Sequence, residues 1–178
     1  MRSDVIFAGI GGQGLITMGQ MLAVAAMNEG KMVSFLPSYS PEVRGGWANC
    51  TVVVSDRGIG SPTVGEPSAV VALESTAVKK HAPTVRPGGL LVINTSLAAD
   101  PVDRDDVQVL EIAANEIALE MGNERVANSI MLGAYVAASG AVELQSVKDA
   151  VAAQLKKRPQ LVEINMQALA RGAEIVSA

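Results

Sequence analysis

The chain has 178 residues, of which 49% are hydrophobic, 18% are charged and only 3% are aromatic. Its net charge is −4, so it lacks the positive surface and the stacking side chains on which nucleic-acid binding depends, and we expect no nucleic-acid partner. The low share of charged residues suggests either a surface partly buried against other proteins or an α/β core rich in small residues.

The chain has one cysteine, Cys50. A disulfide within the chain is therefore excluded, and an iron–sulfur cluster or a structural zinc ion would lack ligands from this chain alone. The sequence Thr-Val-Val-Val follows Cys50 directly and predicts a strand. We expect a buried, unreactive thiol.

The sequence predicts neither a signal peptide nor a membrane span. The first apolar run begins at residue 5, which leaves no room for a signal peptide before it. The longest uncharged stretch, 126–142, is interrupted by asparagine, serine and glycine and falls short of a membrane span. It predicts a tightly packed internal helix, and the chain as a whole predicts a cytoplasmic protein with no membrane partner.

Short apolar runs alternate with helical patterns through the first two thirds of the chain. The expected strands are 5–8, 32–36, 48–55, 69–73, 90–94 and 107–112, and the expected helices among them are 15–29 and 75–81. Pro37 is expected to end the second strand and to begin an irregular loop, 37–50, and a second irregular segment covers 56–67. Continuous apolar strands alternating with helices predict a mostly parallel sheet with helices on both faces.

The last third of the chain is expected to be helical. The pattern predicts helices over 113–121, 126–141, 146–155 and 160–176, with Pro159 separating the last two. Ser146 and Asp149 have the spacing of a capping box at a helix start. The expected fold is a single α/β, Rossmann-like domain, 1–178, with a helical C-terminal third.

A glycine-rich turn, GIGGQG, follows the first predicted strand and precedes the first helix. Gly9, Gly11 and Gly14 match the G-x-G-x-x-G pattern, which brings backbone N–H groups to an anion at a helix start. A dinucleotide site also needs an acidic residue at the end of the second strand, and the sequence MVSFLPSYS has none there. The pattern alone is therefore weak evidence for NAD or NADP.

Two other interpretations of this turn remain open. The glycines can be needed only for a sharp turn and close helix–sheet packing. Alternatively, the turn formed by Gly11, Gly12, Gln13 and Gly14 receives an anionic or polar group from a ligand or another subunit.

The sequence PSYSPEVRGG, residues 37–46, places chemically useful side chains in a loop at the same edge of the predicted sheet. Arg44 has the forked donor geometry that binds carboxylates and phosphates, and Glu42 is close enough to orient it. A simple Glu42–Arg44 surface pair is the alternative. We expect this loop and the glycine turn to be neighbours.

Together, GGQG, PSYSPEVRGGWANCTVVVSD, GSP and the later RPGGLLVINTSL resemble the gamma subunit of 2-oxoacid:ferredoxin oxidoreductases, most closely the 2-oxoglutarate type. The similarity covers the whole chain. Trp47 departs from the pattern, because relatives usually carry a smaller residue there.

The resemblance implies an enzyme complex that converts a 2-oxoacid and coenzyme A to an acyl-CoA and carbon dioxide, and reduces ferredoxin. It places thiamine diphosphate, Mg²⁺ and the iron–sulfur clusters on other subunits, with none bound by this chain alone. The implied partners are alpha and beta subunits, a delta or ferredoxin-like subunit, and ferredoxin. A stand-alone Rossmann-type oxidoreductase and a non-catalytic assembly module are the alternatives.

The resemblance also implies which residues lie near substrate or coenzyme A, or at a partner interface. No residue of this chain is expected to be catalytic or to bind a metal. Arg44 is expected to contact a coenzyme A phosphate, a substrate carboxylate or a partner carboxylate. The expected set is Gly11, Gly12, Gln13, Gly14, Ser38, Tyr39, Glu42, Arg44, Gly45, Gly46, Asn94 and Ser96.

Two groups of titratable residues are expected to have no catalytic role. His81, the only histidine, comes at a predicted helix end without a nucleophile at a suggestive spacing, and a capping or surface role is expected. Asp103, Asp105 and Asp106 are expected to form a solvated surface turn.

Overall fold

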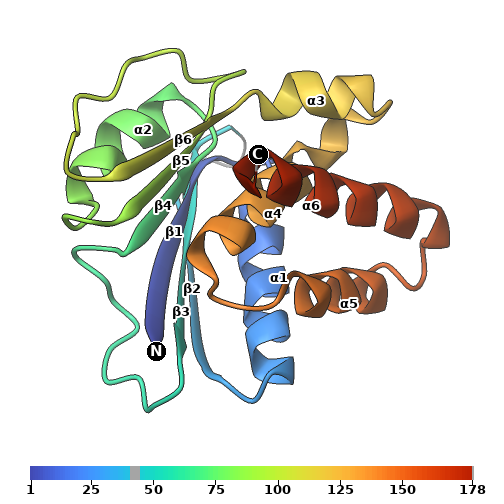
Figure 1. The fold of residues 1–178 in the computed structure, drawn as a ribbon, viewed down its shortest axis with the longest axis horizontal. Helices are drawn as coiled ribbons and strands as arrows, with labels where there is room; N and C mark the ends of the chain where they lie inside the picture. The colour runs from blue at the N-terminus through green and yellow to red at the C-terminus, as the bar shows by residue number, and fades with distance from the viewer. Residues whose placement is uncertain (41–44, 178) are drawn as a thin grey trace.

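A computed structural model describes residues 1–40 and 45–177 of the chain. A central sheet separates helix α2 on one side from α1, α4, α5 and α6 on the other (Figure 1). The elements are β1 (Arg2–Ile10), α1 (Leu15–Asn28), β2 (Met32–Tyr39), β3 (Trp47–Ser55), β4 (Ala69–Ala72), α2 (Ser75–His81), η1 (Ala82–Thr84), β5 (Leu90–Asn94), β6 (Gln108–Ile112), α3 (Ala114–Glu120), η2 (Glu124–Val126), α4 (Ala127–Ser139), α5 (Leu144–Gln154), η3 (Pro159–Leu161) and α6 (Val162–Ser177).

The sheet has six strands in the order β2-β3-β1-β4-β5-β6. Strands β1, β4, β5 and β6 pair in parallel, whereas β3 is antiparallel to both β1 and β2. Only β3 therefore runs against the others, and the carboxyl ends of the remaining strands meet at one edge. The expected mixed α/β fold with a mostly parallel sheet and C-terminal helices is confirmed.

The expected irregular loop over 37–50 is wrong at both ends. Strand β2 continues through Pro37 to Tyr39, and β3 begins at Trp47, so the two strands form a hairpin in which Pro37 is paired with Cys50. Proline is tolerated here because β2 is an edge strand and hydrogen-bonds to a neighbour on one side only. The second expected irregular segment, 56–67, is confirmed, because it contains no helix or strand.

The predicted capping box at Ser146 is also wrong. Helix α5 begins two residues earlier, at Leu144, and its N-cap residue is Glu143, so Ser146 lies within the first turn. The Glu143 N–H donates to Glu29 Oε1 at 2.7 Å. This contact with the end of α1 supplies a helix-start interaction that the local sequence alone does not reveal.

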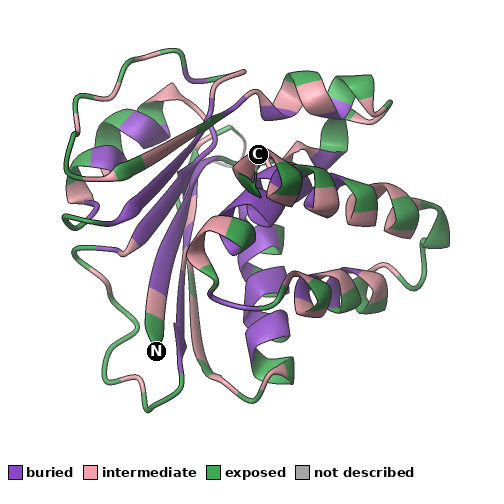
Figure 2. Cartoon of the chain, in the orientation of Figure 1, coloured by how far each residue is buried: buried purple, intermediate pink, exposed green. Residues whose placement is uncertain are grey.

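Side chains at alternating positions of the central strands point into two separate hydrophobic cores. Val5 and Phe7 of β1 point into the larger core, beneath α1, α4, α5 and α6. Ile6 and Ala8 point the other way, into a smaller core beneath α2. Figure 2 shows the central strands as almost wholly buried, while the outer faces of α5 and α6 are exposed.

Helix α2 covers only part of its side of the sheet. It packs against β1 and β4, whereas Val33 and Phe35 of β2 face the opposite side, towards the larger core. Met32 and Leu36 alternate with them and are 58% and 39% exposed. The β2–β3 end of the sheet is thus open on the α2 side.

Helices α4 and α6 cross at two glycines. A Cβ atom on Gly133 of α4 would overlap the main-chain oxygen of Leu169, and one on Gly172 of α6 would overlap that of Ile130. The residues of α4 from Ser129 to Val136 are all buried, as the sequence predicted for an internal helix. The missing side chains allow the two helix backbones to touch.

No helix in the described part of the chain is long and apolar enough to cross a membrane.

Candidate functional site

The glycine turn and the β2–β3 loop meet at one edge of the sheet, as the sequence predicted. The Gly11 N–H donates to the main-chain oxygen of Gly46 at 2.9 Å. The Ser40 N–H donates to the main-chain oxygen of Trp47 at the same distance and closes the hairpin. Two segments separated by more than thirty residues are therefore fixed against each other.

The side chain of Gln13 stabilises its own turn. Its Oε1 accepts from the Ile10 N–H at 2.9 Å, and its backbone N–H donates to the Ile10 oxygen at 3.3 Å. The oxygen of the amide is thus used within the turn. Only the amide nitrogen, for which the described residues supply no acceptor, remains for a ligand.

Gly14 is required by both conformation and space. Its φ is +80°, in the left-handed region, and a Cβ atom there would overlap the Asn128 side chain. Gly14 is also the N-cap of α1 and offers no side-chain acceptor. The first N–H groups of α1 are therefore left without the side-chain cap that most helices have.

A cavity of about 540 Å³, here called the turn cavity, lies beside the glycine turn. Its walls come from Gly12–Gly14, from Asn94 at the end of β5 and Leu97 after it, and from the region where η2 joins α4, which contributes Glu124, Arg125, Ala127 and Asn128. Helix α4 continues directly from η2, whose start is capped by the Asn123 side chain, so its first N–H groups are already bonded. The uncapped start of α1 and the guanidinium of Arg125 favour an anion here, and Glu124 is the opposing charge.

Asn94 and Ser96, which the sequence placed at this edge, have structural contacts there. Asn94 is buried, accepts from the Ala114 N–H at 3.2 Å and donates to the Leu73 oxygen at 3.3 Å. The Ser96 hydroxyl accepts from the Asn115 N–H at 3.1 Å. Both residues hold the start of α3, and of the two only Asn94 lines the turn cavity.

The expected site residues of the β2–β3 loop are only partly placed. Ser38 and Tyr39 lie in β2, where Tyr39 is 62% exposed, and Gly45 and Gly46 precede β3. Glu42 and Arg44 lie outside the described residues. Beside the loop, Trp47 is 43% exposed, and Lys80 Nζ lies 4.4 Å from the centre of its ring.

The Cys50 thiol is buried in the larger core, as expected. Burial raises its pKa to about 12, so it stays protonated throughout the neutral range. Its sulfur lies against α1 at Gly19, where a Cβ atom would overlap it. A sole, fully enclosed thiol does not fit the requirements of a cluster ligand.

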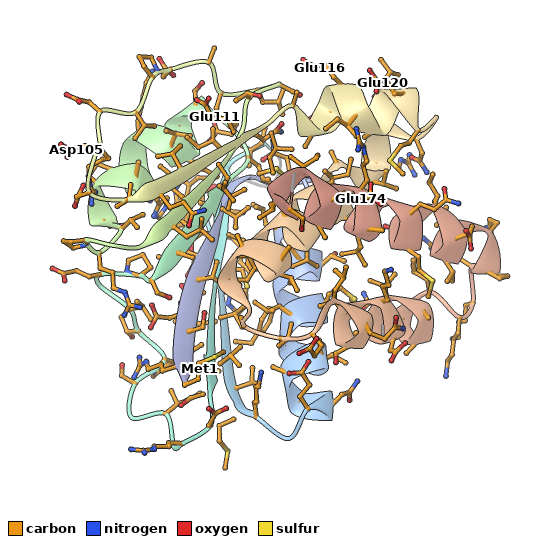
Figure 3. All side chains as sticks on the ribbon, viewed as in Figure 1. Met1, Asp105, Glu111, Glu116, Glu120 and Glu174 are labelled. Atoms are coloured by element: carbon orange, nitrogen blue, oxygen red, sulfur yellow. The ribbon has the colours of Figure 1, made fainter. Side chains whose placement is uncertain are left out.

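The other titratable residues that the sequence singled out, His81 and the aspartates of 103–106, do not line the turn cavity. His81 is the last residue of α2, and burial together with the charge of Lys80 lowers its pKa. Arg104 pairs with Asp106 in an exposed turn, and Figure 3 labels Asp105 at the periphery of the molecule. Residues 1–40 and 45–177 contain no group of three side chains suited to a metal ion.

Arg125 and Asn128 line the turn cavity but are not among the residues expected there from the sequence. Both come just before or within the uncharged stretch that predicted a buried helix. An arginine and an asparagine at the start of an otherwise apolar helix are a detectable signal. The sequence does not show that these two residues lie at the turn cavity, because their position depends on how α4 packs against the sheet.

Residues 4–175 match the family model described as pyruvate ferredoxin/flavodoxin oxidoreductase. The ketoisovalerate oxidoreductase subunit VorA of Methanothermobacter marburgensis is 37% identical over 96% of this chain, which spans only 36% of that relative. The 2-oxoglutarate synthase subunit KorC of Methanocaldococcus jannaschii is 33% identical, over 98% of this chain and 94% of that one.

The fold matches a solved structure over almost its full length. The gamma subunit of a keto/oxoacid ferredoxin oxidoreductase from Geobacter sulfurreducens superposes with a TM-score of 0.86. The two sequences are 30% identical, and the match covers 99% of this chain and 97% of that one.

Proposed function

The chain belongs to the pyruvate ferredoxin/flavodoxin oxidoreductase family as a gamma subunit, and from this we propose that its turn cavity binds the anionic part of coenzyme A in an assembled 2-oxoacid:ferredoxin oxidoreductase. The complex would convert a 2-oxoacid and coenzyme A to an acyl-CoA and carbon dioxide, and pass two electrons to ferredoxin. Alpha, beta and delta or ferredoxin-like subunits would complete it.

One observation carries this proposal: the Gly11–Gly46 hydrogen bond joins both family motifs beside a cavity whose lining includes Arg125 and Gly14, the N-cap of the uncapped helix α1. Phosphate groups suit such a site, because helix N–H groups and an arginine complement their charge without a metal ion. Coenzyme A carries several phosphates. The turn cavity would thus hold the phosphate-bearing end of coenzyme A. The thiol of coenzyme A would remain free to reach a partner subunit.

We assign the redox cofactors to the partner subunits. Thiamine diphosphate with Mg²⁺ would supply the carbanion chemistry, and iron–sulfur clusters would carry the electrons. The buried Cys50 cannot serve a cluster without unfolding its strand. The role of this chain is to bind and orient.

We propose 2-oxoglutarate as the substrate. The support is the similarity to KorC, named as a 2-oxoglutarate synthase subunit, over nearly the full length of both chains. VorA, named for ketoisovalerate, contains a segment like this chain within a protein almost three times as long.

Reconstitution tests the function. Co-expression of the chain with its alpha and beta partners should give a complex that reduces ferredoxin with 2-oxoglutarate and coenzyme A, and the chain alone should show no such activity. Pyruvate, 2-ketoisovalerate and phenylglyoxylate should be poorer substrates. Full activity of the isolated chain, or saturable binding of NADH or NADPH to it, would refute the proposal and favour a stand-alone nicotinamide enzyme.

Replacing Arg125 tests the cavity. In the assembled complex, Arg125→Gln should raise the KM for coenzyme A about 10-fold and change kcat little, because it removes a charge-assisted contact worth about 1.4 kcal/mol. Steady-state kinetics of the purified complex measure this. Arg171→Gln, at an exposed pair with Glu174 on α6, is the control and should leave KM unchanged. Dissociation of the complex by Arg125→Gln would instead indicate an assembly role.

A further inference from the structure

A second cavity, also of about 540 Å³, lies among the helices α1, α4, α5 and α6 and is here called the helical cavity. Its floor is apolar. Met18, Met21, Leu132 and Val151 line it, and none of these four side chains is more than 4% exposed. A volume of this size is typical of small-molecule sites.

Two arginines line the same cavity. Arg125 comes from η2 and Arg158 from the turn between α5 and η3, and no aspartate or glutamate lines the cavity with them. In residues 1–40 and 45–177, neither guanidinium is in an ion pair. The charge of the helical cavity is therefore positive and without an internal counter-ion among the described residues.

The backbone N–H groups of both arginines are hydrogen-bonded within the chain. The Arg125 N–H donates to Asn123 Oδ1 at 3.1 Å, and the Arg158 N–H donates to the Leu155 oxygen at 2.7 Å. These hydrogen bonds hold the backbone of each arginine in place and leave the long side chain free to bind a ligand. A ligand would have to order only the side chains, which lowers the entropic cost of binding.

The side-chain amide of Asn165, which also lines the helical cavity, already has hydrogen-bond partners within the chain. Asn165 Oδ1 accepts from the Ser129 hydroxyl at 2.7 Å, and Asn165 Nδ2 donates to the Leu161 oxygen at 2.7 Å. The one acceptor that this asparagine side chain offers is thus occupied by Ser129. Among the described residues, the two guanidinium groups are the only charged groups in the lining, which also holds the polar side chains of Thr17, Asn123, Asn128 and Gln154.

We infer that the helical cavity binds a small organic carboxylate with a hydrocarbon body. The carboxylate pairs with Arg158 and Arg125, and the hydrocarbon covers the methionine and leucine side chains of the floor. An inorganic anion would have no hydrocarbon to pack against these apolar side chains.

Arg125 and Asn128 line the helical cavity as well as the turn cavity, whereas Arg158 lines only the helical cavity. Arg158 therefore separates this inference from the proposed function. Arg158→Gln should weaken carboxylate binding without changing the KM for coenzyme A in the assembled complex.

Methionine methyl groups locate the ligand directly. Hexanoate is added to the full chain carrying ¹³C-methyl methionine, and the resonances of Met18 and Met21 should shift in a saturable way. Met27 and Met32 are exposed, line neither cavity, and should not move. Met→Leu variants assign the resonances. Hexanamide, which has the same body without the charge, and inorganic phosphate, which has the charge without the body, should each bind at least 10-fold more weakly.

The variant Arg158→Gln should raise the dissociation constant of hexanoate about 10-fold, while Lys156→Gln, on the same exposed turn, should leave it unchanged. Thermal unfolding of both variants checks that they are folded. The inference is wrong if hexanamide binds as tightly as hexanoate, or if the Met18 and Met21 resonances stay still. It is equally wrong if they respond only to partner subunits, which would make the cavity a protein contact.

Discussion

Alanine at either crossing glycine should lower the free energy of unfolding by about 2–3 kcal/mol. Alanine normally stabilises a helix relative to glycine by up to about 1 kcal/mol, so the expected sign is reversed. The reason is that a Cβ atom on Gly133 or Gly172 would overlap the main chain of the opposite helix, and a main-chain atom cannot swing aside as a side chain can. Urea unfolding of Gly133→Ala and Gly172→Ala measures the effect.

A matched control distinguishes this overlap from a general effect of glycine replacement. Gly65 lies in an exposed loop, has no positive φ, and has open space where its Cβ would be, so Gly65→Ala should change stability by less than about 0.5 kcal/mol. The double variant Gly133→Ala/Gly172→Ala should cost less than the sum of the single ones, because one separation of α4 and α6 relieves both overlaps. Single variants as stable as the parent would contradict the close crossing.

Asn94→Ala should destabilise the chain by about 2–3 kcal/mol. The amide of Asn94 joins the end of β4, through Leu73, to the start of α3, through Ala114 and Asn115. Its removal leaves buried polar groups without partners. Denaturant unfolding measures the loss, and faster hydrogen exchange at the Ala114 N–H should locate it at the start of α3.

Ser96→Ala separates this role from simple capping. Its hydroxyl contacts the same helix start but is less buried, so the expected loss is only about 1 kcal/mol. If Asn94 served a ligand and not the fold, Asn94→Ala would instead raise a KM in the assembled complex and leave the unfolding curve in place. That outcome would restore the sequence-based assignment of this residue.

Elements with strong local signals were predictable from the sequence. The apolar run 90–94 and the helix 75–81 match β5 and α2 in both bounds, because glycine or an N-cap residue marks their starts. Pro37 misled the strand boundary, since its effect depends on whether the strand is at the edge of the sheet. The placement of β3 between β1 and β2 was also hidden, because strand order follows from long-range pairing.

The sequence predicted where the candidate site lies better than it predicted what each residue does there. Two motifs following parallel strands had to meet at the carboxyl edge, and the Gly11–Gly46 hydrogen bond confirms it. The roles of Gln13 and Asn94 were not visible, because a polar side chain that binds its own backbone looks the same in sequence as one that binds a ligand. Arg125 reaches the site only through the packing of α4.

The hairpin end of the sheet has a consequence for how the lone subunit behaves. Strand β2 is paired only with β3, so the main-chain groups along its other side are satisfied by water, and Met32 and Leu36 lie beside them on the open face. An edge strand with one unpaired side can pair with a strand from any nearby chain. Purification in isolation therefore favours self-association as concentration rises, and the supply of partner polypeptides becomes a condition for keeping the subunit monodisperse.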